Sequence, residues 1–370
     1  MKVLYIGHYR DGTGYGQAAQ DYILALDSVG VDVVARPFRL NNSTAPIPKR
    51  LQELESKSSV GATHCIQHTL PIHMDFNGRF KKNIALFASE TEGMENTSWV
   101  SKLKAMDQVW VINKQMDDEW SKNLQHKNPI MVIPHAVDTN KFKGRYEQVD
   151  IPPAVGHFKF YFVSELSRRK NLVALLRAFH SEFAWNESIS LVIKTHISGV
   201  SPQEAQQKVS DLCRLVKQDL KLLPVERYKK EVVITDNLSE HDLMRLHATC
   251  DCLVVPSFGE AWSLPAMDAL GMGNPVIVPD IPGQFEFVED SVNGFRVEAH
   301  RDYCLGQTGT FPDLYTGEET WSSISVEGLM SAMRCAFELG NGEMNDAARA
   351  TPEKFSYEKV GAMMKEVLEF

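Results

Sequence analysis

The stretch from Val254 to Pro279 places chemically useful groups between two apolar runs. The runs predict strands, and the residues between them predict a loop followed by a short helix. Ser263 and Leu264 stand just before Pro265, which suits an early helical position because no backbone N–H donor is needed there. The amides at such a helix start favour an anion, so we expect one to bind here.

Two carboxylates lie in the same stretch. Glu260 follows Gly259 on the predicted loop, and Asp268 lies eight positions after Glu260 on the predicted helix. Each carboxylate can accept hydrogen bonds from both hydroxyls of a diol, which is the pattern that a sugar or a ribose offers. The alternative interpretation is a solvated loop carboxylate and a helix-surface charge.

A basic loop follows another apolar run. Lys159 to Val163 predicts a strand, and Arg168, Arg169 and Lys170 follow it before Asn171 opens a helix. Fixed cations stabilise negative charge on a bound group such as a phosphate, and Arg and Lys bind phosphate in different ways. A plain solvated basic loop is the alternative.

A glycine-rich loop follows the first predicted strand. Its glycines, Gly12, Gly14 and Gly16, are spaced as G-x-G-x-G, and Arg36 stands where a dinucleotide-binding fold would carry an acidic residue. The pattern therefore disfavours a dehydrogenase. Close backbone approach to a ligand and an ordinary tight turn both remain open for this loop.

These motifs fall at the ends of alternating strands and helices. Two successive series of this kind predict an α/β protein with two doubly wound, Rossmann-like domains. We expect an N-terminal domain over residues 1–150 and a C-terminal domain over 158–350, joined through an irregular stretch that contains Pro152-Pro153. The final segment, 357–370, reads as an amphipathic helix that packs back on the N-terminal domain. Expected helices lie over 17–26, 98–105, 114–122, 171–183, 202–220, 240–248 and 265–270.

Composition narrows the class further. The formal net charge of −9 disfavours bulk nucleic-acid binding. The six cysteines show no C-x-x-C pair, and no Asp-x-Asp or His/Cys ligand spacing calls for a metal, so we expect reduced thiols and no metal site. No apolar stretch approaches membrane-spanning length, which leads us to expect a cytoplasmic protein, with peripheral membrane contact left open.

The segment VVPSFGEAWSLPAMDALGMGNPVIVP resembles the donor-site signature of family-4 retaining glycosyltransferases, a GT-B group with two Rossmann-like domains facing across a cleft. The resemblance implies that Glu260 contacts the transferred sugar and that Asp268, where the family usually has Glu, binds the ribose. It gives Arg169 and Lys170 the donor diphosphate, although Ser164-Glu165 stands where many members carry an Arg.

The resemblance also implies roles elsewhere in the chain. Lys194 and Asn237 fall where the family frames the nucleoside, and Gly12, Gly14 and Gly16 fall where its N-terminal glycine loop faces the donor. His68 is a candidate for the histidine near the transferred sugar, with His8, His64 and His73 as competitors. Glu90 and Glu92 fall on the acceptor side, beside Trp99.

The expected function is therefore retaining transfer of a sugar from a nucleotide-sugar, such as a UDP- or GDP-sugar, to an acceptor hydroxyl. No further cofactor is expected, and the acceptor is a glycan, lipid, protein or small molecule, as in glycan or glycoconjugate synthesis. A non-catalytic sugar-nucleotide- or glycan-binding protein and a GT-B sugar-nucleotide epimerase remain as alternatives. Residues 299–323, with Gly306, Gly309, Pro312 and Gly317, predict a long irregular insertion.

Overall fold

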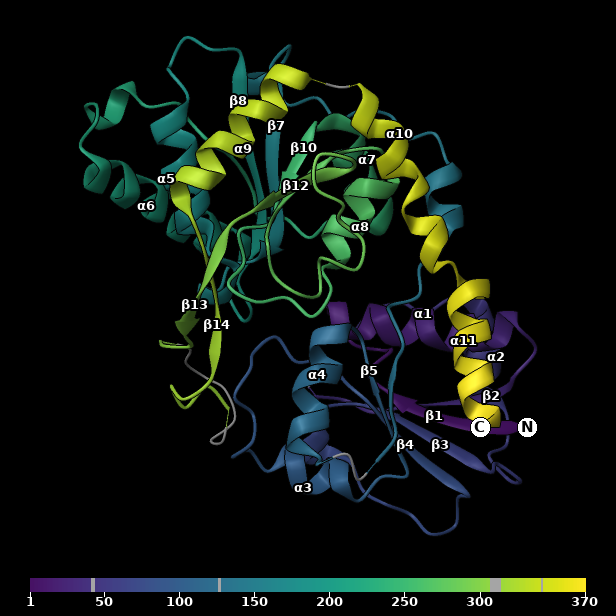
Figure 1. The fold of residues 1–370 in the computed structure, drawn as a ribbon. Coiled ribbons are helices and arrows are strands. Elements are labelled where there is room, and N and C mark those ends of the chain that lie inside the picture. The colour runs from purple at the N-terminus through teal and green to yellow at the C-terminus, as the bar shows by residue number, and fades with distance from the viewer. Residues whose placement is uncertain (41–43, 126–127, 307–313, 341) are drawn as a thin grey trace. The chain divides into compact units, whose positions relative to one another are not determined.

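The computed structural model describes residues 1–40, 44–125, 128–306, 314–340 and 342–370 (Figure 1). They form two compact units. The first contains residues 1–141 and 352–370 together with 314–319, and the second contains 142–306 with 320–351. Gly309 and Pro312 of the predicted insertion lie outside the described residues.

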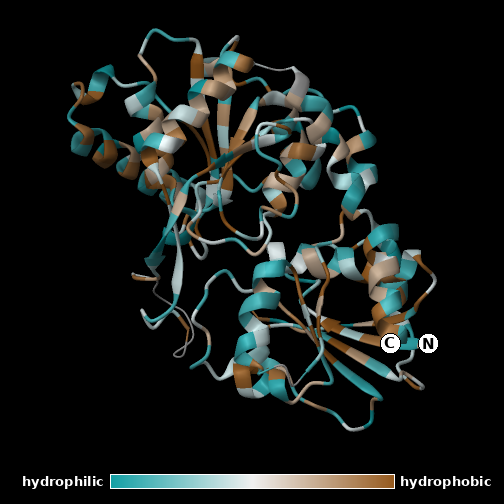
Figure 2. Ribbon diagram, viewed as in Figure 1, coloured by the Kyte–Doolittle hydropathy of each residue, from teal (hydrophilic) through white to brown (hydrophobic). Residues whose placement is uncertain are grey.

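The first unit is a parallel sheet with helices packed against it. The sheet has the strand order β2-β1-β3-β4-β5-β6, and every strand pair is parallel. Its central strands are apolar because both faces are covered, as Figure 2 shows in brown. The elements are β1 (Lys2–Gly7), α1 (Gly14–Ser28), β2 (Asp32–Pro37), α2 (Lys49–Ser56), β3 (His64–His68), β4 (Lys82–Leu86), α3 (Trp99–Lys104), β5 (Gln108–Val111), α4 (Lys114–Asn123), β6 (Ile130–Val132) and α11 (Tyr357–Glu369).

The C-terminal helix α11 packs on α1 within this unit. Tyr357 donates a hydrogen bond to Asp21 at 2.6 Å, and the helices approach so closely at Gly361 that a Cβ there would lie 2.1 Å from the Ala25 carbonyl oxygen. The chain therefore returns to its first unit after completing the second.

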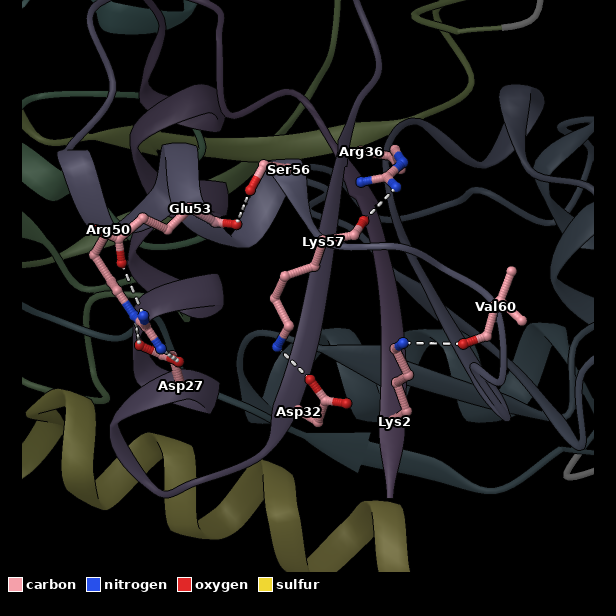
Figure 3. A network of polar contacts seen from close by, with 9 residues as sticks. All are labelled: Lys2, Asp27, Asp32, Arg36, Arg50, Glu53, Ser56, Lys57 and Val60. Carbon is pink, nitrogen blue, oxygen red and sulfur yellow. Dashed lines mark hydrogen bonds and ion pairs between the residues drawn. The ribbon is translucent and has the colours of Figure 1, made fainter.

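A polar network fastens α2 to the neighbouring strand and helix (Figure 3). Arg50 pairs with Asp27 of α1 through two hydrogen bonds of 2.7 and 2.8 Å, and Lys57 pairs with Asp32 of β2. Arg36 donates to the carbonyl oxygens of Glu55 and Lys57, both at 2.7 Å. Arg36 thus anchors the end of α2, which gives this position a structural role.

The second unit has a parallel sheet of order β12-β11-β10-β7-β8-β9. The chain runs outward from β7 through β8 to β9, and then outward on the other side from β10 through β11 to β12. Its core is formed by apolar side chains of these strands and of α5, α6 and α9. The elements are β7 (Phe158–Glu165), α5 (Leu172–Glu182), β8 (Ile189–His196), α6 (Pro202–Leu220), β9 (Val232–Ile234), α7 (Glu240–Thr249), β10 (Cys252–Val254), α8 (Leu264–Gly271), β11 (Val276–Pro279), β12 (Gly294–Val297), α9 (Val326–Leu339) and α10 (Glu343–Ala350).

The predicted irregular insertion is in fact partly regular. Its ends form the strands β13 (Ala299–Tyr303) and β14 (Thr320–Ile324), which pair antiparallel in a separate sheet. The prediction was wrong for these ends because each strand is short and its partner lies beyond residues 304–319, so that no local pattern reveals the pairing.

Candidate functional site

The second unit brings two loops together where its strand order reverses. The strand β10 pairs with β7, and their carboxyl ends lead into residues 255–263 and into a 3₁₀ turn at Arg168–Lys170. Open α/β sheets bind ligands at such a switch point, outside the carboxyl ends of the strands. The basic loop and the Glu260 loop, 90 positions apart, therefore meet at one edge of the sheet.

Glu260 forms the centre of the contacts at this edge. Its Oε1 lies 2.5 Å from Lys170 Nζ, and its Oε2 lies 3.3 Å from Arg169 Nη1. Ser257 donates a further hydrogen bond to Oε1 at 2.7 Å, and Arg169 also donates to the Gly259 carbonyl oxygen at 2.7 Å. The structure thus brings together three of the predicted site residues in one charged cluster.

The cluster keeps Glu260 ionised despite its burial. The residue is only 8% exposed. Burial by itself raises the pKa of a carboxyl, but the charges of Lys170 and Arg169 and the Ser257 hydrogen bond outweigh it and lower the pKa of Glu260 to about 2. At neutral pH the site therefore contains one carboxylate and two cations.

Asn171 allows the chain to present Lys170 and then begin α5. Its backbone is left-handed, with φ 51°, which Asn tolerates better than most residues. Its side chain accepts the Ala174 amide at 3.4 Å and so caps α5. The same residue ends the basic turn and starts the helix.

The helix α8 begins beside Glu260 through a strained residue. Ser263, its N-cap, has φ 89° and makes no side-chain cap hydrogen bond, and Pro265 lies in the first turn. Leu264 is the first helical residue, one position earlier than predicted, and Asp268 lies half-buried one turn later. A positive φ costs free energy for any residue other than glycine, and residues strained in this way are concentrated at functional sites.

We predict that Ser263→Gly leaves the protein as stable or stabilises it by up to about 1 kcal/mol, because glycine adopts positive φ without steric cost. Ser201→Gly provides a matched control, since Ser201 also caps a helix with Pro in its first turn but has φ −65° and caps with its side chain. That variant should lose a few tenths of a kcal/mol. Urea unfolding of both variants measures the difference, and a larger loss for Ser263→Gly would contradict the strain argument.

The predicted nucleoside residues follow the next two strands outward. Lys194, on β8, is 8% exposed, and burial lowers its pKa, partly offset by Asp236. Asn237 is exposed on the loop after β9. Both lie at the carboxyl edge of the sheet that carries Glu260, and their contact with a nucleoside stays a prediction.

His68 lies at the switch point of the first unit, where β1 pairs with β3. It is 1% exposed, and its Nδ1 is hydrogen-bonded to the Tyr5 hydroxyl at 2.7 Å. Its ring also contacts those of Tyr15 and Tyr22. Burial lowers the pKa of His68 well below its usual range, with His135 and His8 adding to the effect, so the imidazole is neutral at pH 7.

The competing histidines are placed differently. His64 begins β3, at the opposite end of the strand from His68, and His73 is exposed. His8 is fully buried after β1, and its Nε2 is among the buried atoms without a hydrogen-bond partner in the described part of the chain. Of these four histidines, His68 and His8 are the two that are buried at the carboxyl edge of this sheet.

The glycine-rich segment is less of a loop than predicted. α1 begins at Gly14, capped by Thr13, so Gly14 and Gly16 lie in its first turn and the predicted start at residue 17 was late. A Cβ at Gly16 would lie 2.0 Å from the Asp11 carbonyl oxygen. Gly12 is exposed, and a Cβ there would have no neighbouring atom nearer than 3.8 Å. Close packing of the helix on its own preceding turn therefore requires glycine at position 16.

Glu90 and Glu92 lie on the loop after β4, and both are half-buried. Glu92 accepts a hydrogen bond from Gln115 of α4. Trp99 is a core residue, 3% exposed and stacked on Trp120. The contact of the two glutamates with an acceptor stays a prediction.

Sequence reasoning missed Ser257 as a site residue. It is fully buried and its hydroxyl contacts Glu260 directly. Its position three residues before the carboxylate, on a loop that leaves a strand, is the signal that could have identified it. The contact itself depends on the loop conformation, which no periodic pattern predicts.

Two further features concern the part of the chain that the structure describes. Within residues 1–40, 44–125, 128–306, 314–340 and 342–370, no group of three or more His, Cys, Asp or Glu side chains is placed to hold a metal ion. Over the same ranges no helix combines the length and the apolar character needed to cross a membrane.

Solved structures with this architecture are glycosyltransferases of the GT-B fold. Anabaena HepE in complex with UDP and glucose matches with a TM-score of 0.68 and 14% identity, covering 100% of this chain and 99% of that one. Sucrose-phosphate synthase from Thermosynechococcus elongatus matches with a TM-score of 0.66 and 16% identity, over 100% and 98%. The chain therefore has the GT-B fold, with two Rossmann-like α/β domains.

A family match by sequence falls within the second unit. Residues 147–303 match the family Glycosyl transferases group 1. Sucrose synthase from Beta vulgaris is 22% identical over 46% of this chain and 22% of its own length. A D-inositol 3-phosphate glycosyltransferase of Mycobacterium sp. (strain KMS) is 36% identical over 17% of this chain and 14% of its own. These alignments cover less than a quarter of either relative. The residues that match the family model include Lys170, Glu260 and Asp268.

Proposed function

We propose that this protein transfers a sugar from a nucleotide-sugar, such as a UDP- or GDP-sugar, to an acceptor hydroxyl with retention of anomeric configuration. The observation that carries the proposal is the buried Glu260 carboxylate held between Lys170 and Arg169 at the switch point of the group 1 domain. A carboxylate and two cations in one sheltered place match the hydroxyls and the diphosphate of such a donor.

The two cations, Arg169 and Lys170, make the main contribution to lowering the reaction barrier. As the glycosidic bond breaks, the diphosphate takes up negative charge, and preorganised cations in a sheltered site stabilise that charge. Arg169 offers a planar fork of donors and Lys170 a compact charge. The backbone amides at the start of α8, which the Ser263 side chain does not cap, add to the same anion site. We propose that these groups serve the diphosphate without a metal ion.

The carboxylates position the donor. Glu260 accepts hydrogen bonds from sugar hydroxyls, and Asp268 accepts them from the ribose. Lys194 and Asn237, on the next strands outward, frame the base. Holding the reacting atoms in this way can be worth roughly 7–11 kcal/mol of the barrier. The leaving phosphate itself takes the proton of the acceptor, so no protein carboxylate acts as a nucleophile.

We assign the acceptor to the first unit. Glu90, Glu92 and the neutral His68 offer polar groups there. Anabaena HepE was solved with UDP and glucose, which supports a UDP-sugar and a hydroxyl-rich acceptor as first trials. The acceptor class is a glycan, lipid, protein or small molecule in glycan or glycoconjugate synthesis.

The experiment is nucleotide release from a panel of UDP-, GDP- and ADP-sugars, with glycan, lipid and small-molecule acceptors and with acceptor omitted. We expect one donor to be cleaved and cleavage to rise with the correct acceptor, in the presence of EDTA as in its absence. The anomeric proton coupling of the product, measured by NMR, reports whether configuration is retained.

Each alternative gives a different result. Nucleotide release that no acceptor increases, with the free sugar epimerised, identifies an epimerase. Tight nucleotide-sugar binding without release under any condition identifies a binding protein. Absence of binding to the whole panel overturns the donor site itself.

A further inference from the structure

The strand β14, to which the proposed donor chemistry gives no role, contacts the Glu260 loop directly. Trp321 of β14 stacks on Phe258, with ring centroids 4.7 Å apart and an interplanar angle of 13°. Trp321 is 4% exposed, while Phe258 is half-buried. Phe258 lies directly between Ser257 and Gly259, two positions before Glu260.

The backbone of Phe258 is held on both sides. Its N–H donates to the Arg169 carbonyl oxygen at 2.8 Å, and its C=O accepts the Ser322 amide at 2.7 Å. The first bond joins the Glu260 loop to the basic turn, and the second joins it to β14. Phe258 therefore links the two charged loops of the site to the inserted strand.

Gly306, which follows β13, lies against the basic turn as well. Gly306 has φ 71° and lies so close to Arg168 that a Cβ there would be 3.1 Å from its Nη1. Arg168 directly precedes Arg169. Both loops of the charged cluster are thus flanked by residues of the same insertion, within the second unit.

Such support matters because residues 255–263 have no regular secondary structure of their own. A misplacement of about 1 Å in a positioning group can cost a hundredfold in rate. Catalytic geometry is held when the supporting side chains are themselves locked by packing and hydrogen bonds. A flat indole stacked on the loop, next to a backbone hydrogen bond, supplies that locking.

We propose that Trp321 is a positioning residue for Glu260, acting through Phe258, and that the strand β14 thereby supports the donor-site loop that carries Glu260. The kinetic part of this inference rests on the proposed function. Trp321 does not touch the donor; it limits the conformations of the loop that carries Ser257 and Glu260.

The first test measures the loop and needs no activity. Hydrogen exchange of the peptide covering 255–262 is followed by mass spectrometry in wild type, Trp321→Ala, Trp321→Leu and Trp321→Phe. We expect faster exchange in the Ala and Leu variants, and near-normal exchange in the Phe variant, which keeps a flat ring. The Leu variant keeps the core apolar and serves if the Ala variant does not fold. His300→Ala, at an exposed position of the partner strand β13, is the control and should match wild type.

The second test measures donor turnover on the same variants. Loss of the indole should lower kcat for sugar transfer by about 10- to 100-fold, and should change the Kd of UDP much less, because Glu260 serves the sugar. Trp321→Phe should recover most of the rate.

Wild-type exchange in Trp321→Ala or Trp321→Leu would overturn the inference, and so would faster exchange with unchanged kcat. If wild type cleaves no donor in the panel, the proposed function fails, while the exchange result still decides whether Trp321 holds the loop.

Discussion

Replacing Lys170 by Ala is expected to lower kcat by roughly 10²–10³-fold, the range seen when one preorganised electrostatic contact to a transition state is removed. Lys170 Nζ lies 2.5 Å from Glu260 and is the compact charge of the pair that we assign to the diphosphate. The effect should fall mainly on kcat, because the leaving group gains its charge as the bond breaks. Steady-state kinetics with the donor identified by the panel, near neutral pH, gives the two constants.

Stability should change less than turnover in this variant. Glu260 would keep Arg169 and Ser257 as partners, so we expect a loss of only about 1–3 kcal/mol. Arg177→Ala is the control: it removes an exposed cation from α5, the helix that follows the basic turn. Its kcat should stay near wild type. Wild-type kcat in Lys170→Ala, or an activity loss that only follows unfolding, would contradict the assignment.

Local signals predicted much of the fold. The helix expected over 202–220 has those bounds in the structure, because Ser201 caps it and Pro202 suits its first position. Most parallel strands of the two sheets were recognisable as short apolar runs between helices, but β12 (Gly294–Val297) was not predicted. The start of α1 was misjudged, since glycines argue against a helix, while the Thr13 cap and the close packing at Gly16 override that preference.

The sequence allowed us to predict which loops meet at the site, but not the side-chain contacts that depend on packing. Adjacent parallel strands bring their carboxyl ends together, so Lys170 and Glu260 could be expected at one edge. The Ser257 hydroxyl on Glu260 and the stacking of Trp321 on Phe258 could not be predicted. Both depend on loop conformations and on a hairpin whose strands are far apart in sequence, and no periodicity encodes either contact.

The second large effect is expected in the pH dependence of stability. Burial opposes ionisation of Glu260, but Lys170, Arg169 and Ser257 outweigh it, and the pKa falls from 4.5 to about 2. A carboxyl with a lowered folded-state pKa stabilises the fold above its unfolded-state pKa and loses that contribution as pH falls toward the folded value. The contribution should therefore be complete above about pH 5 and decline between about pH 4.5 and pH 2, by about 3 kcal/mol in total.

The measurement is urea unfolding of wild type and Glu260→Gln at a series of pH values between about 7 and 3, with the difference in unfolding free energy taken at each pH. Other carboxyls titrate in both proteins and cancel. The advantage of wild type should shrink on acidification, because Gln has no charge to lose. Glu204→Gln, an exposed glutamate of α6 that is 57% exposed, is the control and should run parallel to wild type.

A constant difference between wild type and Glu260→Gln over this range would show that Lys170 and Arg169 do not hold the carboxylate as the distances indicate. A shrinking difference would mean that the ion cluster is formed throughout the neutral range, with Glu260 charged before any donor arrives. The carboxylate is then ready to accept hydrogen bonds from a sugar. Consequently the acid limb of kcat/KM should not reflect titration of Glu260 near pH 4.5, the value of an ordinary glutamate.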